Sequence, residues 1–377
     1  MTENRIYLDN AATTPLDKDV AESMYEVMKE HFGNPSSTHA HGRKVKSIIE
    51  ECRGKISNQL NCKPSEIFFT SGGTEADNLA LRGSVNQLGI KTIITSPIEH
   101  HAVLHTAEEL HKNGSVDLKL VNITADGYVD TKHLEELLSE TENCLVSLMH
   151  ANNEIGNMID LQEIGNICRS HNAYFHCDTV QTMGHFHFDL STNLVDFICG
   201  AAHKFNGPKG VGFIYINKET KISPLITGGA QEREMRGGTE NVYGIVGLTK
   251  ALEMSYATLE SKTQKLKSLK DKMIKRLKSE FTDIKFNGDP EGNSLYTVLS
   301  VSFPPSELGS LLLFNLDLKG ISVSGGSACS SGAVGGSHVI QEISPNTDRT
   351  TVRFSFGKYN TEEDIDNTIE ALKEWYS

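Results

Sequence analysis

Short apolar runs alternate with amphipathic stretches along residues 65–220, and this alternation restricts the fold more than any other feature of the sequence. The runs are rich in β-branched and aromatic residues, which favours strands, and they lie at 67–70, 91–96, 116–123, 144–150, 173–178 and 211–216. Helical patterns fill several of the intervals, at 75–88, 101–113 and 160–172. This order predicts an α/β fold with a mostly parallel sheet covered on both faces, whose ligands bind at the carboxyl ends of the strands.

The rest of the chain predicts a second, smaller domain. With 377 residues the chain is too long for one compact core. A helical pattern over 242–281 carries many lysines, and we interpret its basic side as the solvated face of a helix between two domains rather than as a membrane-binding or partner-binding face. We predict a large domain at 16–258, a small C-terminal α+β domain at 259–377, and an N-terminal segment at 1–15 that joins the small domain.

Charge and cysteine content exclude several classes of protein. The net charge of −13 argues against nucleic acids and anionic membranes as partners. No apolar run approaches the roughly 20 residues that a membrane-spanning helix needs, and "MTENRIYLDNAATTP" has no basic, apolar leader, so we expect a cytoplasmic protein. The seven cysteines show no C-x-x-C spacing, which supports neither a zinc site nor a disulfide framework, and we expect no bound metal.

Two polar segments directly follow predicted strands. In "SGGT" at 71–74, glycines precede a helix, and the N–H groups at a helix start suit a phosphate, although such residues most often only cap a helix. Asp178 closes the run at 173–178. A carboxylate at a buried strand end needs a cationic or N–H partner, such as a protonated ring nitrogen. Helix capping is an equally good interpretation of Asp178.

Histidines and a lysine give further candidates. His100 and His101, with His105, suggest a metal site, but adjacent helical residues face different directions and no nearby carboxylate or cysteine completes a convincing ligand set. We therefore favour one imidazole that lies over a flat cofactor. The alternating "HFHFD" at 185–189 predicts a strand face rather than a site. Lys204 lies in "GAAHKFNGPKG", whose small residues let a ligand approach the backbone closely.

These features together predict a cofactor. Taken alone, Lys204 would be interpreted as a solvated surface lysine. A phosphate-binding turn, an acid for a ring nitrogen, an imidazole that stacks and an amine that condenses with a carbonyl group together describe a pyridoxal phosphate site. The small residues around Lys204 would then let the cofactor reach its amine.

A series of motifs in the same order resembles the NifS/IscS-type cysteine desulfurases. The motifs are "YLDNAATTP", "GNPSSTHAHGR", "TSGGTEADN", "EHHAV", "NNEIG", "HCDTVQ", "AAHKFNGPKGVG", "RGGTENV", "GSACSSG" and "RFSFGKYNTEEDID". Members of this family are pyridoxal 5'-phosphate enzymes of the class V aminotransferase group. The resemblance implies fold type I, with a mostly parallel sheet of the seven-stranded type in the large domain and a smaller C-terminal α+β domain.

The resemblance also implies roles for the residues that match the family's motifs. Lys204 would bind the cofactor covalently and move the Cα proton, Asp178 would pair with the ring nitrogen, and Gln181 with the ring hydroxyl. His100 would stack on the ring and could move protons on the substrate thiol. Residues implied at the phosphate are Gly73, Thr74, His203 and, from the second subunit of a homodimer, Thr239. Asn153 would lie near the ring and substrate, and Arg353 would bind the substrate carboxylate.

Two positions depart from the family pattern. Ala201 stands where the family usually has a phosphate-binding serine, so one hydroxyl contact with the cofactor is missing. Gly335 and Gly336 stand where an acidic residue and a proline commonly follow the family's cysteine. These departures concern cofactor affinity and the choice of partner rather than the chemistry.

Cys329 is the cysteine in the "SGGSACSSGAVGGSH" segment, which has no periodicity and reads as a loop of the small domain. In the family this position receives sulfur as a persulfide, and it could transiently ligate a cluster bound to a scaffold. A low thiol pKa would help, because the thiolate is the nucleophile.

We expect a homodimeric desulfurase that converts L-cysteine to L-alanine and passes the Cys329 persulfide to an acceptor, an iron–sulfur scaffold or a thiolation relay. The alternatives are a selenocysteine lyase, another class V aminotransferase-type enzyme, and a non-catalytic assembly subunit. A plain aminotransferase needs no loop cysteine, and a non-catalytic subunit would tolerate loss of Lys204, which this chain retains.

Overall fold

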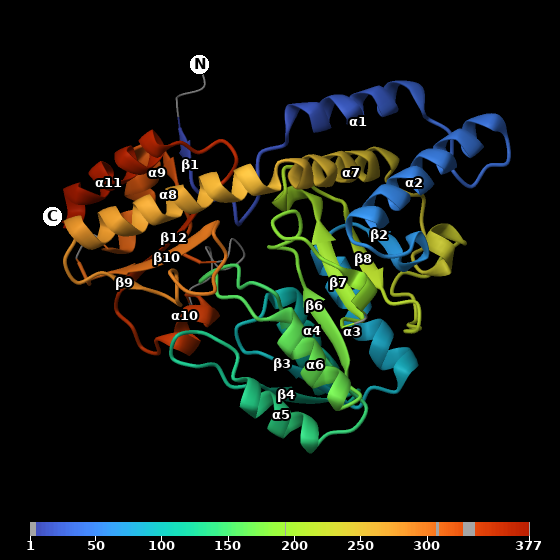
Figure 1. The fold of residues 1–377 in the computed structure, drawn as a ribbon, viewed down its shortest axis with the longest axis horizontal. Helices are drawn as coiled ribbons and strands as arrows, with labels where there is room; N and C mark the ends of the chain where they lie inside the picture. The colour runs from blue at the N-terminus through green and yellow to red at the C-terminus, as the bar shows by residue number, and fades with distance from the viewer. Residues whose placement is uncertain (1–4, 193, 307–308, 327–335, 377) are drawn as a thin grey trace.

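The computed structural model describes residues 5–192, 194–306, 309–326 and 336–376. A large mixed sheet with helices on both faces occupies one side of the molecule, and a smaller group of strands and helices lies beside it (Figure 1). The long helix α8 (Leu259–Glu280) belongs to the smaller group, which we call the C-terminal part.

The large sheet has seven strands. In spatial order they are β2 (Ile67–Thr70), β8 (Gly212–Ile216), β7 (Phe197–Ala201), β6 (Tyr174–Asp178), β5 (Cys144–Met149), β3 (Thr92–Thr95) and β4 (Asp117–Leu120). Only β8 runs antiparallel to its neighbours. The predicted α/β fold with a mostly parallel sheet is therefore confirmed.

Of the seven strands in the large sheet, β7 is the one that the alternation of apolar runs did not predict. Its sequence, FICGA, contains glycine and alanine, which are poor strand formers, and all five of its residues are buried. A central strand that is buried on both faces has no polar alternation to reveal it.

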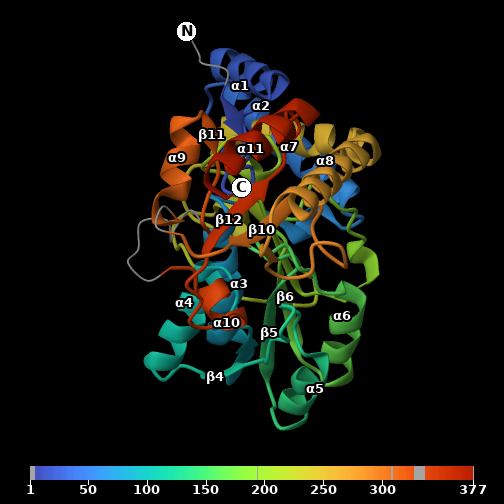
Figure 2. The same cartoon turned by 90° about the vertical axis from the view of Figure 1, so that its left-hand side faces the viewer.

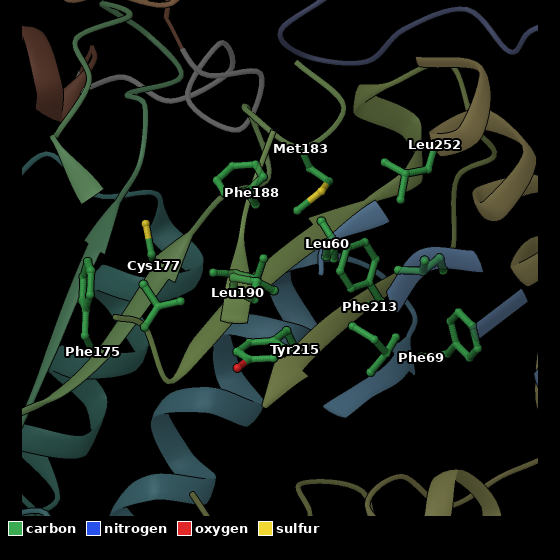
Figure 3. Packing of buried hydrophobic residues seen from close by; sticks show 14 of the residues in the cluster. Leu60, Phe69, Phe175, Cys177, Met183, Phe188, Leu190, Phe213, Tyr215 and Leu252 are labelled. Carbon is green, nitrogen blue, oxygen red and sulfur yellow. The ribbon is translucent and has the colours of Figure 1, made fainter. Parts of the chain in front are cut away.

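Helices cover both faces of the large sheet. The core on one face includes side chains of α3 (Gly73–Leu88) and α4 (His101–Lys112). The core on the other face receives α2 (Ala40–Gln59), α5 (Thr131–Ser139), α6 (Leu161–Ser170) and α7 (Val242–Ala257). Figure 3 shows Phe175, Phe213 and Tyr215, from β6 and β8, within this second core. Helix α1 (Lys18–Glu30) packs beside α7.

The C-terminal part is built on a three-stranded antiparallel sheet. Its strands, in order, are β12 (Thr350–Ser355), β10 (Val298–Phe303) and β9 (Lys285–Phe286). Near the other end of the chain, β1 (Ile6–Tyr7) pairs in parallel with β11 (Ile321–Ser322). The N-terminal strand therefore lies with the C-terminal part. After α8, the described residues form three more α-helices: α9 (Leu312–Leu318), α10 (His338–Ile343) and α11 (Glu362–Tyr376).

The helical pattern predicted over 242–281 is two consecutive helices, α7 and α8, separated at Thr258. Helix α8 lies beside helix α11, as Figures 1 and 2 both show. Lys272 and Arg276 each form an ion pair with Asp366, at 2.9 and 2.8 Å. Part of the predicted solvated face is thus an ion-paired contact between two helices. Among the described residues, no helix combines the length and the apolarity needed to cross a membrane.

The strand predicted at 185–189 is wrong. The backbone there forms turns and irregular structure rather than a strand. Gly184 has a φ of +77°, and the histidines and phenylalanines that follow it make separate contacts instead of lining the two sides of a pleat. The alternation of histidine and phenylalanine in the sequence therefore reflects separate tertiary contacts of these side chains, with both the large sheet and the C-terminal part.

Candidate active site

A cavity of about 240 Å³ lies at the edge of the large sheet. Its lining includes residues that end or follow β2, β3, β5, β6 and β7, strands that all run in the same direction. Predicted site residues in the lining are Gly73, Thr74, His100, Asn153, Asp178, Gln181, Ala201, His203, Lys204 and Arg353. Of the predicted site residues that the structure describes, all except Thr239 thus line this cavity.

The start of helix α3 forms a corner of this cavity that suits an anion, and we call it the α3 corner. The helix begins at Gly73 without a side-chain cap, and the first N–H groups of a helix have no acceptor within the helix. A side chain at Gly73 would bring its Cβ to 2.6 Å from Val180 Cγ2, so only glycine fits this close approach. His203 and the buried methyl group of Ala201 complete the corner. Burial lowers the pKa of His203 to about 4, which keeps its ring neutral.

Asp178 presents a buried carboxyl group to the cavity. Its Oδ1 accepts a hydrogen bond of 2.8 Å from Val180 N. Burial, and then the charge of the neighbouring Asp77, raises the pKa of Asp178 to about 7. No α-helix begins directly after Asp178, so its contact with Val180 closes a turn rather than capping a helix. A cationic N–H in the cavity would stabilise the ionised carboxylate.

Lys204 reaches the same cavity from a short helical turn, Ala202–Lys204, that follows β7. Its Nζ donates hydrogen bonds to the backbone oxygens of Ala11, at 2.5 Å, and Ala12, at 3.1 Å. Gln181 Nε2 donates to the same Ala11 oxygen at 3.1 Å. The N-terminal segment therefore holds the amine in place, which sequence reasoning did not foresee.

His100 and His101 have different surroundings, as their adjacent positions predict. His100 lines the cavity and caps helix α4, where its Nδ1 accepts a hydrogen bond of 3.1 Å from Ala102 N. Burial, and then the charge of Lys204, lowers the pKa of His100 to about 4. Because Nδ1 accepts a hydrogen bond from Ala102 N, the neutral ring carries its proton on Nε2. While His100 caps the helix, its Nε2 can therefore donate a hydrogen bond in the cavity but cannot accept one.

His101 instead contacts His338, a residue that the sequence did not connect with it. His101 Nε2 lies 3.2 Å from His338 Nδ1, and His338 Nε2 lies 2.9 Å from the Glu99 backbone oxygen. The ring of His105 lies 4.2 Å from that of His101. This cluster joins α4 to α10 outside the cavity.

Arg353 enters the cavity from β12 of the C-terminal part. Its side chain is buried, with Nη1 donating to the Asn153 backbone oxygen at 2.8 Å and Nη2 to Asp9 Oδ1 at 2.9 Å. The buried Nε has no hydrogen-bond partner among the described residues. A buried cation with an unused donor fits a ligand carboxylate.

Asp77 is a cavity residue that the sequence analysis missed. It lies one turn along α3 from Gly73, and burial raises its pKa to about 7. Its Oδ1 is 3.4 Å from Nε2 of the buried His176, whose Nδ1 is 2.8 Å from Ser147 Oγ. The position of Asp77 one turn after the predicted phosphate turn, in "GTEAD", was the available signal.

Thr239 is exposed and lies in a separate, smaller cavity of about 70 Å³. Arg236, in the same lining, donates from Nε to Glu75 Oε1 at 2.9 Å. Cys329 lies outside the described residues. Of the described residues that flank it, Gly326 and Ser337 lie together, since a Cβ on Gly326 would be 3.2 Å from Ser337 Cβ.

Comparisons with known proteins show the family to which the chain belongs. The family described as "Aminotransferase class-V" matches residues 6–368. A "Cysteine desulfurase IscS" from Dictyoglomus turgidum is 43% identical over 375 residues, which cover 98% of this chain and 94% of that protein. A solved structure called "NIFS-LIKE PROTEIN" has a TM-score of 0.90 at 38% identity, with 98% of each chain covered. Another, "SspA in complex with cysteine", has a TM-score of 0.81 at 30% identity, with 94% of this chain and all of that chain covered.

Proposed function

Because the chain belongs to the class V aminotransferase family and is a cysteine desulfurase of the IscS/NifS type, we propose that the cavity at the strand ends binds pyridoxal 5'-phosphate and L-cysteine together. Membership of the family implies dependence on this cofactor. The observation that carries the proposal is a single cavity that contains the Lys204 amine, the Asp178 carboxyl group and the N-terminus of α3.

The residues of the cavity fit the cofactor at both of its ends. The α3 corner suits the phosphate, and His203 and Thr74 lie beside it. The buried carboxyl group of Asp178 suits the protonated ring nitrogen, which would hold it ionised. Gln181 would contact the ring hydroxyl, and the neutral ring of His100 would stack on the cofactor.

When bound, the cofactor supplies an electron sink for charge that develops at the substrate Cα. Lys204 would bind the cofactor covalently and then take and return the Cα proton. Arg353 would hold the substrate carboxylate beside Asn153, through the guanidinium donor that has no other described partner. Cys329 would take the sulfur atom as a thiolate: its S–S bond to the substrate sulfur forms while the Cβ–S bond of cysteine breaks, and the electron pair of that bond stays on Cβ. A proton, equivalent to the one that the Cys329 thiol gave up, would then be added to Cβ, and alanine would be released.

The sulfur on Cys329 would then pass to the thiol of an acceptor, an iron–sulfur scaffold or a thiolation relay protein. A cytoplasmic location is part of the same proposal. Persulfide transfer needs free thiols, and a reducing compartment keeps thiols free.

The direct test is turnover of L-cysteine by the purified protein loaded with the cofactor. We expect alanine and, with a reductant, sulfide in equal amounts, measured by amino-acid analysis and a sulfide assay. A keto acid in place of alanine would instead identify a plain aminotransferase. Turnover of selenocysteine without turnover of cysteine would identify a selenocysteine lyase.

We also propose a homodimer in which Thr239 completes the phosphate site of the second subunit. Thr239 is exposed and lies outside the main cavity of its own subunit, where a partner subunit could contact it. The preceding turn is held rigidly, because Glu232, Arg233 and Glu234 all have positive φ and the buried Arg53 pairs with Glu232 at 2.8 Å.

Thr239→Ala should weaken cofactor binding by about ten- to a hundredfold, since a hydrogen bond to a charged group stabilises by roughly 1.5–3 kcal/mol. Cofactor dissociation followed by absorbance measures the effect, and sedimentation measures the dimer. Thr227→Ala, an exposed threonine near the same turn, is the control and should bind normally. A monomer with full cofactor affinity would contradict the proposal.

A further inference from the structure

The carboxylate of Asp9 holds the guanidinium of Arg353 from the N-terminal segment. Asp9 Oδ1 accepts a hydrogen bond of 2.9 Å from Arg353 Nη2, and the two groups form an ion pair. The exposed fraction is 2% for the Arg353 side chain but 20% for the Asp9 side chain. Loss of Asp9 would therefore leave a buried cation without the carboxylate that pairs with it and with almost no access to water.

The second described contact of the guanidinium crosses to the large sheet. Arg353 Nη1 donates to the backbone oxygen of Asn153 at 2.8 Å, and Asn153 follows β5. Asp9 instead belongs with the C-terminal part, because it forms a β-bridge with Ser355, two residues after Arg353 on β12. Asp9 thus fixes one edge of the guanidinium from within the same part of the molecule, beside the main cavity that Arg353 lines.

The backbone at Asp9 is held by contacts that do not involve its carboxylate. The Asp9 backbone oxygen accepts hydrogen bonds from Ala12 N and from the Tyr7 hydroxyl, both at 3.1 Å. The side-chain amide of Asn10 donates to the Ser355 backbone oxygen at 2.9 Å. Replacing the carboxylate alone should therefore leave this turn in place.

We propose that Asp9 is a positioning residue for substrate binding: its carboxylate fixes the orientation in which the Arg353 guanidinium receives the substrate carboxylate. This role rests on the proposed role of Arg353. A guanidinium carries five N–H groups in a planar fork, and Asp9 and Asn153 each accept from a different nitrogen. Donors are left for a second carboxylate, among them Nε, which has no hydrogen-bond partner among the described residues.

The first test is the turnover of L-cysteine by cofactor-loaded Asp9→Ala. A carboxylate that takes no part in the chemistry contributes equally to the binding of the substrate and of the transition state, so weaker binding of it changes KM rather than kcat. We expect KM to rise about tenfold, the lower end of the range for loss of a hydrogen bond to a charged group, with kcat near wild type. An unchanged KM would overturn the inference, and so would a lower KM, which would mean that Asp9 competes with the substrate for Arg353.

The second test uses two amines that differ only by a carboxylate, L-alanine and ethylamine. Their binding to the cofactor-loaded protein is followed by the absorbance of the bound cofactor. Asp9→Ala should weaken the binding of L-alanine about tenfold and leave that of ethylamine near wild type. Equal weakening of both would indicate a general disturbance of the cavity and would overturn the inference.

Two further variants provide the control and the rescue. Asp366→Ala is the matched control, because it also removes an arginine ion pair of the C-terminal part, with Arg276 at 2.8 Å, but lies outside the cavity lining. It should bind both amines normally. Asp9→Asn keeps an oxygen for Arg353 Nη2 without the charge, so it should recover part of the lost L-alanine affinity. If Asp9→Ala does not fold, Asp9→Asn carries the test, with an expected loss of about threefold.

A double-mutant cycle shows whether Asp9 acts through Arg353. Once Arg353→Leu has removed the group that Asp9 positions, adding Asp9→Ala should change L-alanine affinity by less than about twofold. A tenfold further loss in that background would overturn the inference.

Arg353→Leu alone separates this inference from the proposal on which it rests. It should weaken the binding of L-alanine far more than that of ethylamine. Unchanged binding of both amines in Arg353→Leu would contradict the role of Arg353 and overturn the role of Asp9 with it. Loss of L-alanine binding in Arg353→Leu together with normal binding in Asp9→Ala would overturn the role of Asp9 alone. The two amines are not desulfurated, so these outcomes do not depend on desulfurase activity.

Discussion

Cys329→Ser is expected to bind the cofactor normally and to lose desulfurase activity by on the order of 10³-fold or more. The residues proposed to hold the cofactor line one cavity and do not include the thiol. A serine hydroxyl cannot accept sulfur to form a persulfide, so the cofactor spectrum and its response to cysteine should remain while alanine formation stops. Alanine analysis and mass spectrometry of the protein measure the two outcomes.

The other cysteines provide controls for this variant. Cys144 and Cys199 are buried in the large sheet, at 1% and 0% exposure, and burial raises the pKa of each thiol. Replacing Cys144 by serine should lower thermal stability more than turnover, because a hydroxyl would enter an apolar core. Desulfuration by Cys329→Ser at the wild-type rate would mean that Cys329 is not the sulfur acceptor.

Lys204→Ala is expected to abolish turnover together with the visible absorption band of the covalently bound cofactor. The amine is held in the cavity by the backbone oxygens of Ala11 and Ala12, and its loss removes both the covalent attachment and the group proposed to move the Cα proton. The α3 corner and Asp178 remain in this variant, so it should still bind the cofactor weakly and without a covalent bond. Absorbance and dialysis distinguish the two states.

Lys209→Ala is the matched control for this prediction. Lys209 is exposed and belongs to the same glycine-rich segment, but it does not line the cavity. Its loss should leave spectrum and turnover near wild type. A normal absorption band in Lys204→Ala would assign the covalent attachment to another residue.

Most of the fold was predictable because its signals are local. The predicted runs at 67–70 and 144–150 match β2 and β5 to within a residue, since β-branched and aromatic residues mark them clearly. Strand β7 and the turn at 185–189 were not predictable in this way. The first has no polar alternation because it is buried on both faces, and the second alternates for reasons of tertiary contact.

The candidate site likewise contains residues that local sequence signals predict and residues that they do not. Lys204, Asp178 and Gly73 directly end or follow strands, where chain order alone places them at one edge of the sheet. Asp9, which pairs with Arg353, and His338, which contacts His101, come from the opposite end of the chain to their partners. No local pattern reports such contacts, because they depend on how the C-terminal part docks.

The pairing of β1 with β11 has a consequence for the order in which the enzyme matures. Ile6 pairs with Ile321 and Asp9 with Ser355, and the segment that follows supplies the oxygens that hold Lys204. During synthesis these first residues leave the ribosome long before their partners exist, and contacts so distant in sequence form late in folding. The lysine therefore gains its final surroundings only when the chain is almost complete, so cofactor loading is expected to follow translation rather than accompany it.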